Sequence, residues 1–243
     1  MLGWLLLPTG VPQTARAIGA QTVVDIRTVD FSGYVPPRPT AAQRLSWELR
    51  QRTSVETRLE PTRVRLDDPR LFDTPLLYLA GERAFPPWSE AEVTGLRRFV
   101  EFGGFVLLDD AAPTQAGFDG SIRRELVRAF GATALVPLAQ SHTIYRSFYL
   151  LNRPSGRVEV GKGVEAVMRG GRAAVIYTRT DLGGALDRDN LGNYLHPVEP
   201  GGETQRETAI RFAVNLIVYA LCLDYKDDQV HAPFIMRRRA GTK

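Results

Sequence analysis

The pattern of hydrophobic and polar residues predicts five strands along the chain. A two-residue alternation predicts half-buried strands at 22–30 and 55–59, and Pro61 indicates that the second of these is an edge strand or an irregular strand with a jog. Compact apolar runs at 74–82, 105–108 and 172–181 predict strands that are covered on both faces, as in a parallel sheet. Further short strands are expected between 157 and 171.

A spacing of three and four residues between apolar positions predicts the helices. The predicted helices cover residues 41–53, 90–102, 119–131 and 203–221. Thr40 is a plausible N-cap for the first helix, and Ser89 with Glu92 forms a capping box for the second. Residues 181–203 are rich in glycine and are expected to form a long surface loop.

The order of these elements predicts the fold class. Strands that alternate with helices indicate a parallel sheet with right-handed crossovers. We therefore expect a three-layer α/β fold with a mostly parallel, flavodoxin-like sheet. The expected organisation is a possible signal segment at 1–20, a single α/β domain at 21–223 and a polar basic tail at 224–243.

Composition and charge exclude some classes of function. The chain has 243 residues, of which 44% are hydrophobic, and a formal net charge of +4. The basic residues are spread along the chain except for Met236–Arg239, so the pattern does not favour nucleic-acid binding. The one cysteine, Cys222, rules out an internal disulfide and is expected to pack as a small hydrophobic residue.

The first twenty residues favour export. An apolar stretch from Leu2 to Leu7 is followed by Pro8 and by small residues, which is typical of a secretory signal with a cleavage region. The apolar stretch is too short to span a bilayer, and no later segment is long enough either. We expect a periplasmic or secreted protein. The alternative is a cytoplasmic protein whose first residues form an ordinary strand or an irregular terminus.

Acidic residues follow two of the predicted buried strands. Asp109 and Asp110 follow the strand at 105–108, and Asp181 ends the strand at 172–181. The carboxyl ends of parallel strands meet at the edge of the sheet where ligands bind, and His142 is expected to reach the same edge from its loop. Such a cluster suits acid–base chemistry or a divalent metal ion.

A structural role for the same residues is the alternative. Adjacent carboxylates on a strand point to opposite sides, so one pocket receives only one member of the pair. In this interpretation one aspartate caps the following turn and the other is solvated. Gly81 and Glu82 end another strand, where the glycine permits a close approach by a helix or a ligand. Asn215, a polar residue in an apolar helix, is expected to hold a neighbouring loop.

Several segments resemble a known bacterial family. The most specific are "GGFVLLDD" at 103–110, the pair Phe118 and Asp119, and the pair Ser141 and His142. Over roughly 55–223 the chain resembles the family called domain of unknown function 4159. This resemblance implies a fold similar to class I glutamine amidotransferases. Those enzymes have a nucleophilic cysteine after the strand that corresponds to 105–108, where this chain has Asp109 and Asp110, so glutaminase activity is not supported.

Two functional hypotheses follow from these observations. The first is a non-catalytic module of the bacterial cell envelope that binds a small ligand or an envelope protein partner and needs no cofactor. Its predicted binding residues are Gly81, Glu82, Asp109, Asp110, Asp119, His142 and Asp181. The second is a hydrolase, with or without the help of a divalent metal, in which Asp110, His142 and Asp181 are the catalytic residues.

Overall fold

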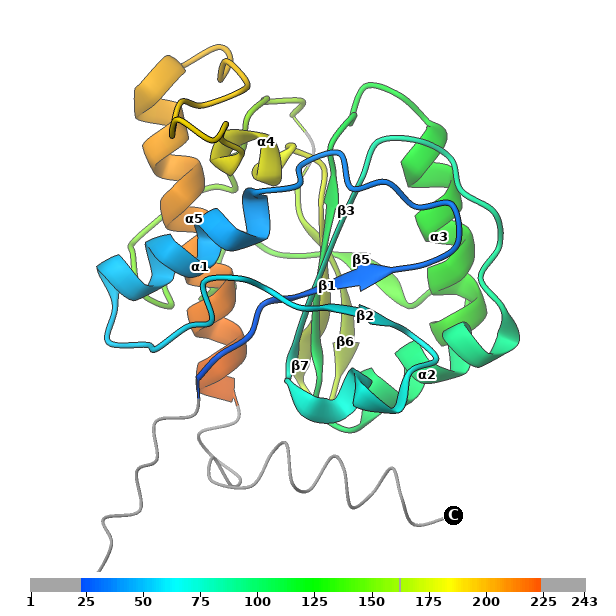
Figure 1. The fold of residues 1–243 in the computed structure, drawn as a ribbon. Helices are drawn as coiled ribbons and strands as arrows, with labels where there is room; N and C mark the ends of the chain where they lie inside the picture. The colour runs from blue at the N-terminus through cyan, green and yellow to red at the C-terminus, as the bar shows by residue number, and fades with distance from the viewer. Residues whose placement is uncertain (1–22, 162, 224–243) are drawn as a thin grey trace, which may run out of the picture.

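A seven-stranded sheet with the order β2-β1-β3-β4-β7-β6-β5 forms the centre of the molecule. The computed structural model describes residues 23–161 and 163–223, and Figure 1 shows the sheet between two groups of helices. The strands are β1 (Arg27–Asp30), β2 (Arg63–Arg65), β3 (Leu76–Gly81), β4 (Phe105–Asp110), β5 (Leu135–Pro137), β6 (Glu165–Arg169) and β7 (Arg172–Thr178). All neighbours from β2 to β7 pair in parallel, and β6 and β5 continue the sheet in antiparallel pairing.

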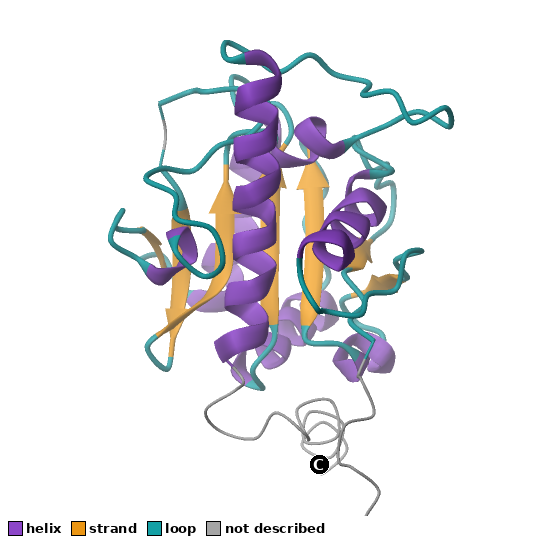
Figure 2. Ribbon diagram, turned by 90° about the vertical axis from the view of Figure 1, so that its left-hand side faces the viewer, coloured by secondary structure: helices purple, strands orange, loops and turns teal. Residues whose placement is uncertain are grey.

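Helices cover both faces of this sheet. The helices are α1 (Ala41–Arg52), α2 (Glu90–Glu101), α3 (Gly117–Phe130), α4 (Leu182–Leu186) and α5 (Gly202–Leu223), with single 3-10 turns η1 (Pro69–Asp73) and η2 (Thr143–Tyr145). Buried residues of α1, α4 and α5 form one core with the sheet, and those of α2 and α3 form another on the opposite face. In Figure 2 the first group lies in front of the strands. The prediction of an α/β protein with a mostly parallel sheet is confirmed.

The alternation of side chains along β3 and β4 explains why both cores are apolar. Tyr78 and Leu107 belong to the core beneath α1, α4 and α5, whereas Leu79 and Leu108 belong to the core beneath α2 and α3. Every residue of these two strands is buried. A strand buried on both faces is a continuous apolar run, which is the pattern that identified both strands in the sequence.

Local capping determines where α2 begins. The Ser89 side chain accepts a hydrogen bond from the backbone N–H of Glu92, and the Glu92 carboxylate accepts one from the backbone N–H of Ser89. The predicted capping box is therefore confirmed. Thr40 occupies the N-cap position of α1, but its hydroxyl donates to Asp187 at 2.6 Å and makes no capping bond.

The second strand lies later than its pattern predicted. The alternating residues at 55–59 make only an isolated bridge, between Thr57 and Val24, and the strand β2 begins after Pro61. The alternation continues through Arg63 and Val64, and this part of the chain pairs with β1. Thr57 is instead buried with its hydroxyl donating to the carbonyl of Ser46 in α1. Periodicity identified an edge strand but placed it several residues too early.

Part of the predicted surface loop at 181–203 is a buried helix. All five residues of α4 are buried between β4, α1 and α5. Gly183 permits this position, because a Cβ atom there would lie 2.4 Å from the hydroxyl oxygen of Tyr78. The glycine pair that suggested a flexible loop in the sequence thus allows a short helix to pack against the sheet.

The last helix, α5, contains two residues for which the sequence predicts a role, Cys222 and Asn215. Cys222 is exposed, so the prediction that it packs in the core is wrong, since α5 is near its end at this position. Asn215 is fully buried, and its side chain accepts hydrogen bonds from the N–H groups of Phe148 and Tyr149 and donates one to the carbonyl of Tyr149. The prediction that Asn215 holds a loop is confirmed.

Replacing Asn215 with leucine is expected to lower the free energy of unfolding by about 1–3 kcal/mol, because the backbone groups of Phe148 and Tyr149 lose their partners. Hydrogen exchange at these two amides should accelerate more than at the rest of the protein. Thr208→Ala, a change at a partly exposed position on the same helix, is the control and should alter stability by no more than about 0.5 kcal/mol. Unchanged protection of both amides in the leucine variant would contradict this role.

None of the helices in the described ranges is long and apolar enough to cross a membrane.

Candidate functional site

A polar crevice lies where the chain diverges on either side of β1. From β1 the chain passes to β2 on one side and returns to β3 on the other. Ligand sites of open α/β sheets occur at such divergence points. Here a cavity of about 230 Å³ lies above β1 and β3 and beside the first turn of α1. Its polar lining consists of Thr28, Tyr34, Arg38, Gln43, Glu60, Arg63 and Tyr78. We call this cavity the crevice.

Two predicted aspartates lie behind the crevice and hold its wall. Asp109 is fully buried, and one of its carboxylate oxygens accepts a hydrogen bond from the hydroxyl of Tyr78 at 3.1 Å. The same carboxylate accepts the N–H groups of Leu182 (2.8 Å) and Gly183 (2.6 Å), the first residues of α4. A carboxylate at a helix N-terminus is favourable, since it satisfies backbone donors that have no partner within the helix. Asp109 therefore fixes Tyr78 and α4 relative to β4.

Asp181 holds the second wall residue, Arg38. The Arg38 guanidinium donates to both carboxylate oxygens of Asp181, at 2.9 and 2.8 Å, and Arg157 donates to the same carboxylate. Asp181 adopts a left-handed backbone conformation with φ of 49°, which aspartate tolerates better than most residues. Its side chain also accepts the N–H of Gly184. Both aspartates thus cap α4, and neither is exposed.

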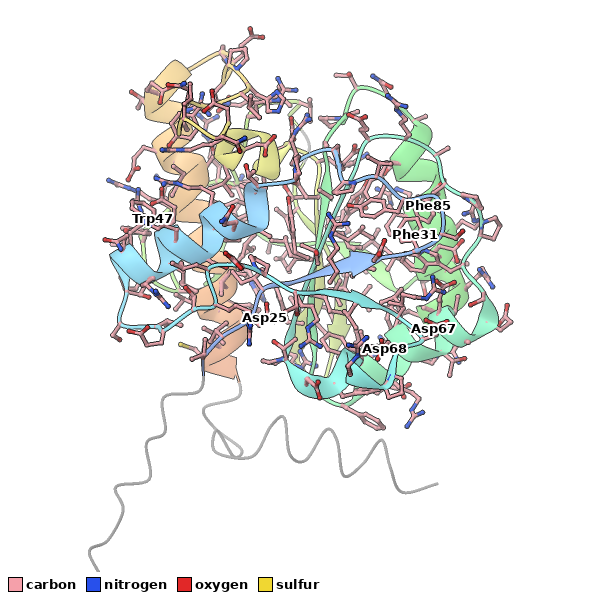
Figure 3. The ribbon with its side chains drawn as sticks, in the orientation of Figure 1. Asp25, Phe31, Trp47, Asp67, Asp68 and Phe85 are labelled. Atoms are coloured by element: carbon pink, nitrogen blue, oxygen red, sulfur yellow. The ribbon has the colours of Figure 1, made fainter. Side chains whose placement is uncertain are left out.

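Tyr34, the aromatic residue at the mouth of the crevice, is held in place by contacts with the end of β3 and with the loop after β1. The Tyr34 hydroxyl donates to the carbonyl of Ala80 at the end of β3, and its ring stacks on Phe31 with centroids 4.6 Å apart. Phe31 in turn lies 5.0 Å from Phe85, in the loop after β3, and the two are adjacent in Figure 3. The loops that follow β1 and β3 are therefore joined by aromatic packing, which positions Tyr34 over the crevice.

Asp110 faces the opposite side of the sheet from Asp109, as strand geometry predicts. One Asp110 oxygen accepts the N–H of Ala112 at 3.0 Å, so this residue stabilises the turn after β4. The other lies 3.4 Å from the Tyr177 hydroxyl, which donates to Asp119 at 2.9 Å. Burial raises the pKa of Asp110. Burial also acts on Asp119, but the hydrogen bonds from Tyr177 and Arg123 outweigh it and lower the pKa of Asp119.

The expectation that one aspartate of the pair is solvated is wrong, because both are fully buried. The capping interpretation is confirmed for Asp110. Asp119 and Asp110 lie together on the α3 side of β4, whereas Asp109 and Asp181 lie together on the α4 side. The predicted acids therefore form two pairs on different faces of the sheet.

His142 lies at the other end of the sheet from these acids, so the expectation that it reaches them is wrong. Its ring contacts Tyr219, with centroids 5.3 Å apart, and the Tyr219 hydroxyl accepts the N–H of Ala173 at the start of β7. Asp181 follows the end of the same strand. From Ala173 to the last residue of β7, Thr178, the strand extends about 17 Å, so His142 and Asp181 lie near opposite ends of β7. His142 caps the 3-10 turn η2, and burial lowers its pKa.

Gly81 has a packing role. A Cβ atom at this position would lie 2.0 Å from the ring of Phe118 in α3, so the glycine permits helix and strand to approach closely. Glu82 is partly exposed and forms an ion pair with Arg83. Neither residue lines the crevice, so the close approach expected at Gly81 is that of a helix.

The aspartates beside the crevice direct their carboxylate oxygens at hydrogen-bond donors of the protein itself. Within the described residues, no group of three or more His, Cys, Asp or Glu side chains is arranged to hold a metal ion. The chemistry of the aspartates agrees with this, because the oxygens of Asp109 and Asp181 already accept hydrogen bonds from helix amides, Tyr78 and two arginines. A carboxylate has about four acceptor sites, and these hydrogen bonds occupy most of them in Asp109 and all of them in Asp181.

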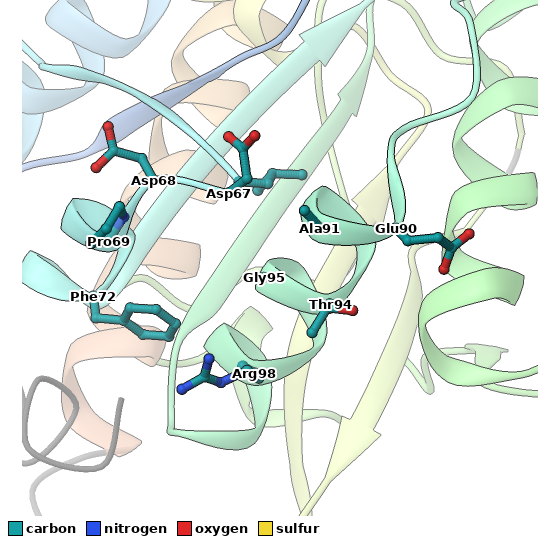
Figure 4. A pocket seen from close by; sticks show the side chains of 10 residues that line it. Asp67, Asp68, Pro69, Phe72, Glu90, Ala91, Thr94, Gly95 and Arg98 are labelled. Carbon is teal, nitrogen blue, oxygen red and sulfur yellow. The ribbon is translucent and has the colours of Figure 1, made fainter. Parts of the chain in front are cut away.

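A larger cavity, of about 670 Å³, lies away from the crevice, between η1 and α2. Figure 4 shows Asp67, Asp68 and Glu90 in the upper half of the view and Phe72 and Arg98 in the lower half. Each of the three carboxylates pairs with an arginine outside the cavity: Arg65, Arg70 and Arg128 respectively. None of the site residues predicted from the sequence lines this cavity. The three carboxylates at the cavity are already paired with arginine side chains. We therefore place the candidate site at the crevice.

Sequence reasoning missed the residues that line the crevice. Tyr34 and Arg38 come from the segment between β1 and α1 and Arg63 from the edge strand β2, and only the fold brings them beside Tyr78. Tyr78 had a usable signal, because a tyrosine in the otherwise apolar run of β3 needs a partner for its hydroxyl. Arg38 had none, because a single arginine in a proline-rich loop is ordinary surface composition.

The stability of the protein is expected to depend on the titration of Asp109. Burial, together with the charge of Asp181, raises the pKa of Asp109 to about 7, whereas an unfolded chain releases this proton near about pH 4. Between these values the folded state binds the additional proton, so the contribution to the free energy of unfolding falls as pH rises and levels off above about pH 7.

Asp109→Asn removes this contribution. Urea unfolding at intervals from about pH 4 to about pH 8 should show that wild-type stability, relative to the variant, declines as pH rises through this window. If the two curves run parallel, the carboxyl of Asp109 titrates normally and the argument from burial fails.

An open α/β sheet with a polar crevice at the divergence of its parallel strands describes this class of protein. The chain belongs to the family described as domain of unknown function (DUF4159), whose sequence model matches residues 24–221. The resemblance noted in the sequence is thereby confirmed at the level of the family. A comparison with curated proteins found no match.

Proposed function

We propose that this protein is a non-catalytic binding module of the bacterial cell envelope, with a flavodoxin-like, amidotransferase-like fold that lacks the nucleophilic cysteine. The crevice is its binding site for a small polar ligand or a protein segment. One observation carries this proposal. Two of the predicted acids, Asp109 and Asp181, are buried behind the crevice and hold its wall residues Tyr78 and Arg38 in place.

The strand order supports the proposed fold. Five parallel strands follow one another as β2-β1-β3-β4-β7, which is the order of the flavodoxin-like class, and the crevice lies at the divergence between β1 and β3. The strand β4 ends in Asp109 and Asp110, whereas in an amidotransferase the corresponding strand would be followed by the nucleophilic thiol. Cys222, the one cysteine of the chain, lies in α5.

The lining of the crevice suits binding more than catalysis. It presents two guanidiniums, two tyrosine hydroxyls, a threonine hydroxyl, an amide and one carboxylate, which are groups that orient a polar ligand through hydrogen bonds. Nucleophilic catalysis needs a nucleophile within reach of a base. In the part of the chain that the structure describes, His142 lies far from the crevice, and both neighbouring aspartates already accept several hydrogen bonds from the protein itself.

A hydrolase that uses Asp110, His142 and Asp181 is the second candidate. The observation in its favour is the raised pKa of Asp110 at the carboxyl end of a central strand, since a carboxyl acid of this kind suits proton transfer. It requires a rearrangement that brings His142 from the opposite end of the sheet.

One experiment separates the two candidates. The full chain is screened by thermal shift against small-molecule and peptide fractions of a bacterial envelope extract, together with Mg²⁺, Ca²⁺, Mn²⁺ and Zn²⁺. A ligand at one hundred times its Kd should add about 2.7 kcal/mol of stability. Arg63→Glu, an exposed crevice variant, should lose the shift, and Arg70→Glu, exposed elsewhere, should retain it.

The hydrolase would be supported instead by turnover of generic ester, phosphate or glycoside substrates that Asp110→Asn and His142→Ala abolish. A fraction that stabilises wild type and both arginine variants equally would remove the crevice as the binding site.

Export is part of this proposal, and it rests on residues 1–20, which lie outside the described residues. N-terminal sequencing of the protein from its native host should find a mature chain that begins after the small-residue region near Ala20. A chain in the cytoplasm that still begins at Met1 would remove the envelope location.

A further inference from the structure

A second cavity adjoins the crevice across the first turns of α1. It has a volume of about 420 Å³, and Gln43 lines both cavities. The segment before β2 also borders both, because Leu59 lines the second cavity while Glu60 lines the crevice. We call the second cavity the outer cavity. The two form one path over α1 that is longer than a small ligand needs.

The outer cavity presents apolar side chains to solvent. Trp47 of α1 is 38% exposed, and Figure 3 shows it at the periphery of the molecule, on the opposite side from Phe31 and Phe85. The Arg44 guanidinium lies 3.8 Å from the centre of its ring. Leu191 is 88% exposed and lies between Asn190 and Gly192, which both line the cavity. Exposed tryptophan, leucine and arginine gathered at a cavity are typical of protein interfaces.

The loop that carries Leu191 is held rigidly. The Asp189 carboxylate accepts the backbone N–H groups of Leu191 and Asn193 and the side-chain amide of Asn193. The backbone of Asp189 also exchanges hydrogen bonds with Asn193 and Gly192. An apolar side chain on a pre-ordered loop loses little conformational entropy when it is covered by a partner. The loop is therefore suited to binding.

The charges along the path favour an acidic partner. Among the described residues, no carboxylate lies within ion-pair distance of Arg63 in the crevice or of Arg188 in the outer cavity. Arg188 stacks on Tyr194 at 4.0 Å and donates one hydrogen bond to the carbonyl of Gly192. Of the two acids that line the path, Asp189 already accepts the hydrogen bonds of its own loop. One guanidinium in each cavity is thus available to a carboxylate.

We propose that the occupant of this path is an extended, acidic protein segment with an apolar anchor. This inference rests on the proposed function and specifies its ligand. The apolar side chain packs on Trp47 and Leu191, and carboxylates pair with Arg188 and Arg63. A polyanion such as a nucleic acid fits less well, because Glu60 lines the crevice together with Arg63, and the other cations of the path, Arg38 and Arg44, are already paired with Asp181 and Glu48.

Fluorescence anisotropy with labelled fifteen-residue peptides tests this proposal in the full chain. The probes are an extended peptide of Asp, Glu and Leu, its counterpart with Lys and Arg, an uncharged counterpart, and a twenty-nucleotide oligo-dT. The acidic peptide should bind best, and its affinity should fall with added salt. Trp47→Ala and Arg188→Glu should each weaken binding about tenfold or more, and Arg188→Glu should shift the preference toward the basic peptide. Arg70→Glu, far from the path, is the matched control and should behave as wild type.

The outcomes separate this inference from the proposed function. If a probe responds to Arg63→Glu but not to Trp47→Ala or Arg188→Glu, the crevice binds a ligand, and the outer cavity takes no part. Preference for oligo-dT, or a dimer in sedimentation that Leu191→Ser dissociates, overturns the acidic segment as occupant. If no variant along the path, Arg63→Glu included, alters any binding, both proposals fall.

Discussion

Replacing Asp109 with alanine is expected to lower the free energy of unfolding by about 3 kcal/mol or more. Asp109 is fully buried and accepts hydrogen bonds from Leu182, Gly183 and Tyr78. Its removal leaves three buried donors without an acceptor, and each such loss costs about 1 kcal/mol or more. Urea unfolding followed by circular dichroism measures the change.

The neighbouring residue provides the control. Asp110→Ala removes one local hydrogen bond, to Ala112, while the Tyr177 hydroxyl keeps Asp119 as its acceptor. Its effect should be about 1 kcal/mol. Two adjacent aspartates of one strand, both fully buried, should thus differ severalfold. Equal losses for the two variants would show that burial of the strand end, and not the cap on α4, sets the stability.

Replacing Gly81 with alanine is expected to cost about 2–3 kcal/mol. The added Cβ would lie 2.0 Å from the ring of Phe118, which is fully buried in the core beneath α3 and cannot move without displacing its neighbours. The double variant with Phe118→Leu should lose less stability than the two single changes add up to, because the smaller side chain makes room for the methyl group.

Gly120→Ala is the matched control for Gly81, since Gly120 lies in α3 with no atom near its missing Cβ. This change should stabilise the protein by about 0.5–1 kcal/mol through helix propensity. A neutral Gly81→Ala variant would mean that α3 moves away from β3 easily, and the close approach would then carry little energy.

The sequence predicted elements well where local signals agreed with burial. In α2 the capping box, the apolar stripe and the two glycines that follow the helix, Gly103 and Gly104, all indicate the same helix. The strand β4 was visible because a buried parallel strand is a continuous apolar run. By contrast, β2 has only three residues, and its position depends on pairing with β1, which periodicity does not contain.

The same distinction explains the candidate site. Strand geometry correctly placed Asp109 and Asp110 on opposite faces, because that rule is local. The location of His142 depends on how η2 packs against α5, and no local pattern specifies that contact. The helix α4 was missed because its amides are capped by Asp109, which is distant in sequence. Tyr34, Arg38 and Arg63 meet only through the fold.

The two margins of the sheet have a consequence for how this protein behaves at high concentration. Both outer strands, β2 and β5, have only three residues, and β2 carries two exposed arginines while β5 ends in a proline. Edge strands this short offer few unpaired backbone N–H and C=O groups with which another chain could pair. The arginine charges on β2 and the proline in β5 make such pairing still less favourable. The described portion of the molecule should therefore resist amyloid-like stacking.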